Sequence, residues 1–161
     1  MIYLGIDTSN SPLTVALMKD ENVLIEETTN LKINHSLTAM PAVEEMMKKA
    51  KISPADLTHI AAASGPGSYT GVRIGLTIAK TLAWSLKIPL HTVSSLKVLA
   101  ANGRYFDGLV CPIMDARRGT VFTGLYDGSD LSTVIEDQHS DLNEFLVRVK
   151  EQKQSVLFTG I

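Results

Sequence analysis

A chain of 161 residues with 45% hydrophobic side chains is long enough to bury a core, as one domain or as two small lobes. Its net charge of −2 argues against a surface that binds nucleic acid unaided, because phosphates are neutralised by clustered lysines and arginines. The single Cys111 excludes an internal disulfide and fits a reducing cytoplasm, and we expect neither a signal sequence nor a membrane span.

The first thirty residues predict an antiparallel meander of three strands. Three apolar, β-prone runs are separated by turn-forming residues, and the first turn begins at Asp7. The runs are 2–6, 13–18 and 22–29. From Leu37 to Ala50, apolar residues then recur at helical spacing. Pro41 lacks an N–H group and would break an interior turn, so either Thr38 caps a late-starting helix or the first helical turn is bent.

A glycine-rich turn at 64–75 connects a predicted strand at 58–63 with a predicted helix at 70–86. Its backbone N–H groups lie at a helix start, where they could receive a phosphate or cap the helix. It is not a Walker phosphate loop, because Val72 follows Gly71 where that motif requires lysine. A structural turn is favoured, because glycine-rich turns are common. The residues that would bind an anion are Gly65, Gly67, Ser68 and Gly71.

Two neighbouring predicted helices carry apolar faces that must be buried against another part of the protein or against a partner. The helix predicted at 70–86 is apolar on nearly every side, which indicates burial on more than one face. Its second cover could be another helix of the same chain or the helix of a partner. The helix before it carries a stripe rich in methionine, which suits an irregular interface, although a core role is commoner. The stripe comprises Leu37, Met40, Val43 and Met47.

The second half of the chain repeats the order of the first. A strand ends at Asp115, a tight turn follows, and another strand runs over 120–125, as around Asp7. A chance likeness of two hairpins is the alternative, and aspartate before a turn is also favoured for a local hydrogen bond to the backbone. The other predicted elements are strands at 90–93, 131–135 and 156–158 and helices at 94–101 and 141–151.

Four segments together carry a family resemblance. They are Leu4-Gly5-Ile6-Asp7-Thr8-Ser9, His35-Ser36, Gly65-Pro66-Gly67-Ser68-Tyr69-Thr70-Gly71-Val72-Arg73-Ile74-Gly75 and Asp115-Ala116-Arg117-Arg118-Gly119. These segments closely resemble the TsaB (YeaZ) family, the accessory subunits of bacterial tRNA threonylcarbamoyladenosine synthesis. The resemblance implies an α/β fold of duplicated lobes like those of actin, sugar kinases and chaperone ATPases, which are ribonuclease H-like. It implies an N-terminal interface lobe at 1–102 and an incomplete second lobe at 103–161, truncated because TsaB-like proteins are longer.

The resemblance implies a non-catalytic scaffold in the cytoplasm. Such a subunit pairs with the catalytic TsaD-type paralogue, with a TsaE-type ATPase as third member, for threonylcarbamoylation of the adenosine 3′ of the anticodon in ANN-decoding tRNAs. It reaches tRNA only through this complex, and alone it forms a homodimer through the same surface. The expected contact residues are His35, Leu37, Met40, Val43, Met47, Arg73, Leu76 and Lys80.

Neither metal nor catalytic residues are expected. TsaD carries a His-x-x-x-His metal pair, whereas His35 is followed at that spacing by Ala39. The family was once grouped with a glycoprotease (peptidase M22-like), but no nucleophile signature is present. The chain alone is expected to bind no cofactor, and ATP or ADP only in the complex. A vestigial nucleotide cleft would use Asp7, Gly65, Gly67, Ser68, Gly71 and Asp115. Alternatives are a small-molecule kinase of this fold that uses Asp7, and a stand-alone binding module.

Overall fold

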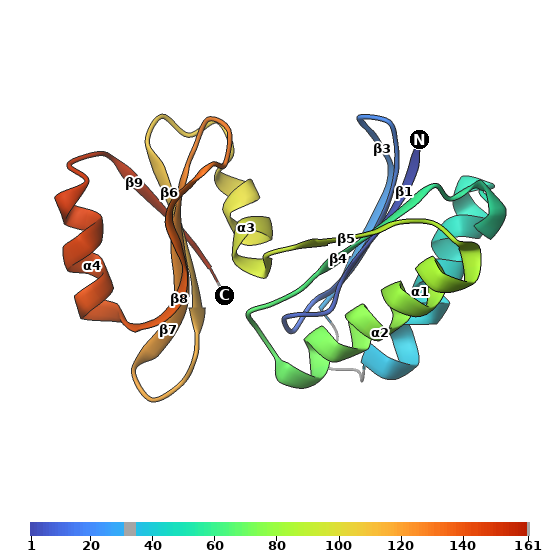
Figure 1. Cartoon of the computed structure of the whole chain (residues 1–161), viewed down its shortest axis with the longest axis horizontal. Coiled ribbons are helices and arrows are strands. Elements are labelled where there is room, and N and C mark those ends of the chain that lie inside the picture. The colour runs from blue at the N-terminus through green and yellow to red at the C-terminus, as the bar shows by residue number, and fades with distance from the viewer. Residues whose placement is uncertain (31–34, 161) are drawn as a thin grey trace. The chain divides into compact units, whose positions relative to one another are not determined.

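The computed structural model describes residues 1–30 and 35–160, which form two compact α/β units, Met1–Val93 and Ser94–Ile161. The first unit contains a five-stranded sheet with the order β3-β2-β1-β4-β5 (Figure 1). Its strands are β1 (Ile2–Asp7), β2 (Leu13–Lys19), β3 (Asn22–Thr29), β4 (His59–Ala63) and β5 (Leu90–Val93). The first three pair antiparallel and confirm the predicted meander, whereas β4 runs parallel to both β1 and β5.

Two helices, α1 (His35–Ala50) and α2 (Tyr69–Leu86), pack on one face of this sheet. Alternate residues of β2 are buried against them, as expected for a strand with one covered face. The helix α1 begins at His35 and runs through Pro41, which excludes one of the two alternatives, a late-starting helix capped by Thr38. Proline removes one backbone donor, and the burial of the α1 core residues outweighs that loss. A short 3-10 turn, η1 (Pro54–Asp56), precedes β4.

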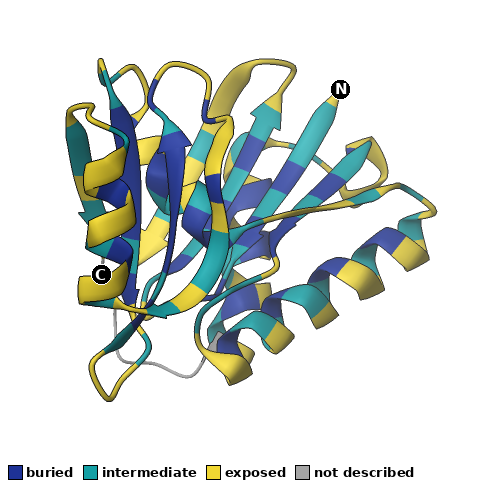
Figure 2. Ribbon diagram, turned by 60° about the vertical axis from the view of Figure 1, so that its left-hand side comes forward, coloured by how far each residue is buried: buried dark blue, intermediate teal, exposed yellow. Residues whose placement is uncertain are grey.

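The buried side of α2 consists of small residues. Gly71, Gly75, Ala79 and Ala83 are buried at intervals of four residues, and this spacing puts them on one face of the helix. Without large side chains in between, the helix axis lies close to β1 and β4. Buried and exposed residues alternate along the helices of this unit (Figure 2). The larger apolar side chains of α2 are partly buried at the flanks of the core.

The second unit repeats this plan. Its sheet has the order β8-β7-β6-β9, in which β6, β7 and β8 are antiparallel and β9 is parallel to β6. The strands are β6 (Leu109–Asp115), β7 (Thr120–Asp127), β8 (Thr133–Asp141) and β9 (Val156–Gly160). Helix α4 (Leu142–Glu151) connects β8 to β9 just as α1 precedes β4. The same pairing pattern over four strands confirms the predicted repeat and argues against a chance likeness of two hairpins.

Both faces of the second sheet are covered by helices. Helix α3 (Ser95–Ala100), capped by Ser94 and followed by η2 (Ala101–Gly103), packs on one face, and α4 packs on the other. The predicted lobe boundary lies at 102/103, whereas in the structure the second unit begins at Ser94 and so includes α3. That the first lobe is an interface lobe stays a prediction. Strand β8 starts later and runs further than predicted, because Leu131 lies in a turn at φ 60° and the polar residues that follow pair with β7.

Candidate functional site

The first hairpin begins where β1 ends at Asp7. Both the backbone N–H and the hydroxyl of Ser9 donate hydrogen bonds to Oδ1 of Asp7, at 2.8 and 2.6 Å. This local pattern closes the turn, as aspartate in that position commonly does. The turn role proposed for Asp7 is therefore present, and a role in a nucleotide cleft stays a prediction.

The glycine-rich turn packs against this hairpin. The N–H of Ser68 donates to the carbonyl oxygen of Ser9 at 2.7 Å. A Cβ atom added at Gly67 would lie 2.3 Å from that same oxygen, so only glycine allows the approach. Ser68 also caps α2, because its hydroxyl accepts from the N–H of Gly71 at 3.2 Å. Gly65, with φ 95°, provides the sharp bend before them.

The start of α2 is held directly on the hairpin. The Thr8 hydroxyl donates to the carbonyl oxygen of Gly71 at 2.6 Å, in a buried position. A Cβ atom at Gly71 would lie 2.1 Å from the Thr8 carbonyl oxygen. The N–H groups of Ser68, Gly71 and Val72 all have protein acceptors. These contacts give the glycines a structural role, and their predicted role in binding an anion stays untested.

Asp115 occupies the matching place in the second unit. Its Oδ1 accepts from the N–H of Arg117 at 2.7 Å, which is the same two-residue spacing as between Asp7 and Ser9. The carboxyl group is exposed. The second hairpin therefore copies the turn chemistry of the first, although no glycine turn of the second unit covers it in the part of the chain that the structure describes.

The predicted contact stripe of α1 is divided between surface and core. Leu37 is 71% exposed and Met40 is 41% exposed, so both can meet a partner. Val43 and Met47 are only 2% and 7% exposed and belong to the core of the first unit. A partner could therefore contact Leu37 and Met40, whereas Val43 and Met47 pack α1 onto the core of the first unit. The side chain of His35 lies outside the described part of the structure.

The outer side of α2 contributes exposed polar and aromatic groups. Arg73 lies over the Tyr69 ring, 5.1 Å from its centroid, and its guanidinium donates to the Tyr69 hydroxyl at 3.0 Å. Lys80 is exposed, and Leu76 is partly buried against the core. Of the three predicted contact residues on α2, Arg73 and Lys80 are therefore exposed, and Leu76 is partly accessible.

Two hollows follow the seam between α1 and α2, and Met40 lines both of them. One has a volume of about 400 Å³ and is bordered by Tyr69 and Arg73, and the other measures about 390 Å³ and is bordered by Met47 and Leu82. Charge at the second is balanced locally, because Lys48 pairs with Glu44 at 2.7 Å. That hydrogen bond lowers the pKa of Glu44 and raises the pKa of Lys48. The second hollow is therefore apolar and carries little net charge, whereas the first is bordered by the cationic Arg73.

Trp84 is an exposed residue of α2 that was not among the predicted contact residues. It is the one tryptophan of the sequence, and it is 84% exposed on α2. It follows Lys80 by four residues and Arg73 by eleven, so all three lie on one side of the helix. That spacing was visible in the sequence. A large exposed aromatic side chain on the outer side of a helix is typical of an interaction surface.

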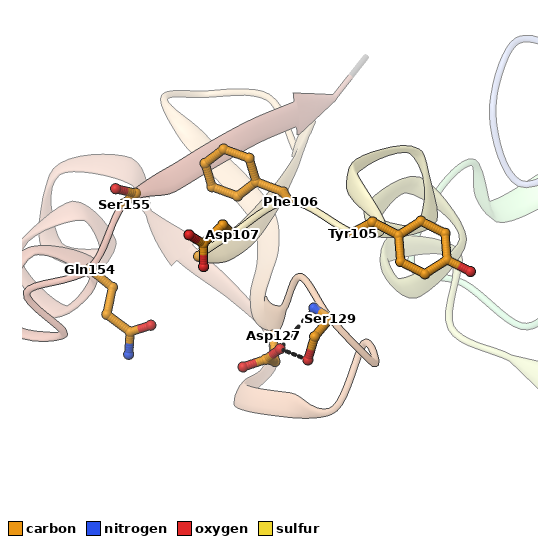
Figure 3. A pocket seen from close by; sticks show the side chains of 8 residues that line it. Tyr105, Phe106, Asp107, Asp127, Ser129, Gln154 and Ser155 are labelled. Atoms are coloured by element: carbon orange, nitrogen blue, oxygen red, sulfur yellow. Dashed lines mark hydrogen bonds between the residues drawn. The ribbon is translucent and has the colours of Figure 1, made fainter.

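A polar hollow of about 640 Å³ lies in the second unit, beyond the starts of β6 and β9 (Figure 3). Its lining residues are Tyr105, Phe106, Asp107, Gly108, Asp127, Ser129, Gln154 and Ser155. The Ser129 hydroxyl and N–H both donate to Asp127 and lower the pKa of its carboxyl group. Because the Asp127 carboxylate is already hydrogen-bonded within its own turn, we assign no catalytic role to this hollow, which lies where several loops meet.

No metal centre is formed by residues 1–30 and 35–160, since no three His, Cys, Asp or Glu side chains there come together. Ala39, where the second ligand of a His-x-x-x-His pair would stand, has no donor atom and is fully buried. A His-x-x-x-His metal pair is therefore not formed on this helix, and the expectation that the chain binds no metal stays a prediction. Among the helices that the structure describes, none has the length and apolar character needed to cross a membrane.

Known proteins similar to the chain share one pathway name. The family described as "TsaD: tRNA N6-adenosine threonylcarbamoyltransferase" matches residues 22–159. The "tRNA threonylcarbamoyladenosine biosynthesis protein TsaB" of Bacillus subtilis (strain 168) is 54% identical over 99% of the chain and 71% of its own length. The protein of the same name from Escherichia coli (strain K12) is 30% identical over 86% of the chain, which spans 64% of that relative.

A solved structure of a similar protein supports the same relationship. "YeaZ from Pseudomonas aeruginosa" has a TM-score of 0.76 and 27% identity, over 86% of this chain and 65% of that one. This likeness confirms the predicted actin-like, ribonuclease H-like α/β fold. The chain thus spans about two thirds of the length of these relatives.

Proposed function

The chain belongs to the TsaB family, and on this premise we propose that it is a non-catalytic scaffold subunit in tRNA threonylcarbamoyladenosine biosynthesis. It pairs through its first unit with a catalytic TsaD-type paralogue, and a TsaE-type ATPase joins the complex. The modified group is the adenosine 3′ of the anticodon in ANN-decoding tRNAs, in the cytoplasm. Without that partner, the same surface binds a second copy of the chain.

The observation that carries this proposal is the exposed seam between α1 and α2. Leu37, Met40 and Trp84 leave large apolar groups exposed on these two helices, whose inner faces pack on the core of the first unit. Apolar hollows lie between the two helices, where side chains of a facing helix pair can insert. Large apolar side chains at such a surface lose water on association, and this supplies the main favourable free energy.

Two further observations support a role without catalysis. The position of the second metal ligand of TsaD is taken by Ala39, which is buried and cannot bind a metal. The N–H groups of Ser68 and Gly71, at the start of α2, already have acceptors within the protein. A phosphate would have to displace these contacts to bind there. Both features favour a supporting subunit over a kinase of the same fold.

Sedimentation velocity of the full-length protein with the TsaD-type protein of the same organism tests the proposal. We expect a one-to-one complex in the mixture and a homodimer in the sample without partner. Activity of the mixture in threonylcarbamoylation of a tRNA transcript should require both proteins. If the two proteins sediment independently at micromolar concentrations, and the mixture is no more active than TsaD alone, the scaffold proposal is wrong.

Asp7→Asn separates a turn role from a cleft role. Asparagine keeps the oxygen that accepts from Ser9, so we expect the free energy of unfolding to change by no more than about 0.5 kcal/mol. Activity of the complex should also be kept, because a scaffold does not use the carboxylate charge. Urea unfolding and the tRNA modification assay check both points. Nucleotide hydrolysis by the full-length protein that disappears in Asp7→Asn would instead favour the kinase alternative.

A further inference from the structure

The hairpin between β6 and β7 has an unusual backbone and unusual charges. Arg117, Arg118 and Gly119 have φ values of 68°, 53° and 79°, so three consecutive residues are in the left-handed region. For glycine this region is favourable, whereas an arginine there is strained. Asparagine or glycine would fit both arginine positions better. The sequence thus places two long cationic side chains where the backbone disfavours them.

Hydrogen bonds hold this strained backbone in place. The N–H of Ala116 donates to the carbonyl oxygen of Thr120 at 3.0 Å, and the Thr120 N–H donates to the carbonyl oxygen of Arg117 at 3.0 Å. The Thr120 hydroxyl donates to that same Arg117 oxygen at 2.8 Å. Since its hydrogen is used there, this hydroxyl accepts from Nε2–H of His139 at 2.6 Å. Strand β8 therefore braces the hairpin.

None of these hydrogen bonds uses a guanidinium group. Both arginines are exposed, and among the residues that the structure describes neither guanidinium has a carboxylate within salt-bridge distance. Asp115 is the nearest acid along the chain, and the backbone N–H of Arg117 donates to its carboxylate. The guanidinium groups can therefore bind an anion from solution without losing a hydrogen bond or ion pair within the protein.

We propose that Arg117 and Arg118 bind the phosphate backbone of the tRNA, and this inference rests on the proposed function. Guanidinium groups form paired hydrogen bonds with phosphate oxygens. The hairpin tip borders none of the hollows described above, and a free nucleotide needs a concave site, whereas a polyanionic strand can lie along a projecting loop. With a net charge of −2 over the whole chain, binding depends on such local positive groups together with those of the partner.

The test uses the variant Arg117→Asn with Arg118→Asn in the full-length protein, assembled with its TsaD-type partner. Asparagine removes both charges and suits the left-handed backbone, so the melting temperature of the variant should rise by about 2–4 °C. Fluorescence anisotropy with an ANN-decoding tRNA transcript at several salt concentrations measures binding. We expect affinity to fall about tenfold and the slope of log K against log salt concentration to become less negative by about 2.

The matched control is Lys51→Asn with Lys153→Asn. Both lysines are exposed at φ 56° and 52°, so this variant also removes two charges from left-handed positions, and neither position belongs to the hairpin. It should leave tRNA affinity unchanged. Equal losses in both variants, or unchanged affinity of the hairpin variant in an assembled complex, would overturn the inference.

Titration of the same complex with ADP distinguishes the two sources of phosphate. If only ADP binding weakens in the hairpin variant, the arginines serve a nucleotide and the tRNA assignment is wrong. Sedimentation of each sample reports assembly separately. Failure of the wild-type chain to join TsaD overturns the proposed function and this inference with it, whereas intact assembly with unchanged tRNA binding overturns this inference alone.

Discussion

Replacing Gly71 by alanine should lower the free energy of unfolding by about 3 kcal/mol. The added Cβ atom would lie 2.1 Å from the Thr8 carbonyl oxygen, which belongs to the backbone and cannot rotate away. The start of α2 would have to move off the hairpin, and the 2.6 Å hydrogen bond from the Thr8 hydroxyl would be lost. Urea unfolding measures the change as a lower midpoint with an unchanged slope.

Ser85→Ala is the control for this substitution, because Ser85 is exposed on the same helix. It should change stability by no more than about 0.5 kcal/mol. Helix propensity alone makes the opposite prediction for Gly71→Ala, a gain of about 1 kcal/mol. A more stable Gly71→Ala variant would therefore show that α2 does not lie so close to the hairpin.

Trp84→Glu should weaken association with the TsaD-type partner by about 30-fold or more, the equivalent of the 2 kcal/mol that marks a central interface residue. The side chain is 84% exposed, so its replacement removes little packing from the folded chain. A carboxylate on the outer side of α2 would also have to lose water on association. Sedimentation velocity over a range of concentrations gives the dissociation constant, and the melting temperature should stay within about 2 °C.

Val147→Glu provides the matched control, because Val147 is an apolar residue, 58% exposed, on helix α4 of the second unit. It should leave the dissociation constant unchanged. Should Trp84→Glu bind TsaD as tightly as the wild type, the outer side of α2 is not the contact surface. The substitution Met47→Glu is not suitable for this purpose, because Met47 is 7% exposed and a charge there would disrupt the core.

Most of the fold could be predicted from the sequence, because its elements have clear local signals. Alternating apolar residues define β2, and serines that favour a helix start stand before α2 and α3, where Ser68 and Ser94 cap the helices. The repeat was visible in the two aspartate hairpins. Strand β8 was less predictable, because its second half is polar and is fixed by pairing with β7.

The candidate surface was harder to predict. Spacing along α1 groups Met40 with Val43 and Met47, but it does not reveal which part of a broad apolar face the sheet covers. On α2 the large apolar residues lie on nearly every side and indicated burial on more than one face, whereas the buried residues are Gly71, Gly75, Ala79 and Ala83. Small residues give a weak hydrophobic signal, because they bury little area each, although their interval of four residues was readable.

The close seating of α2 also has a mechanical consequence. The Thr8 hydroxyl donates to the carbonyl oxygen of Gly71, the N–H of Ser68 donates to the carbonyl oxygen of Ser9, and at Gly71 the helix lies directly against the backbone of the hairpin. We therefore expect the first turns of α2 and the Asp7 hairpin to move together. A displacement of the start of α2 would then carry that hairpin with it through these contacts.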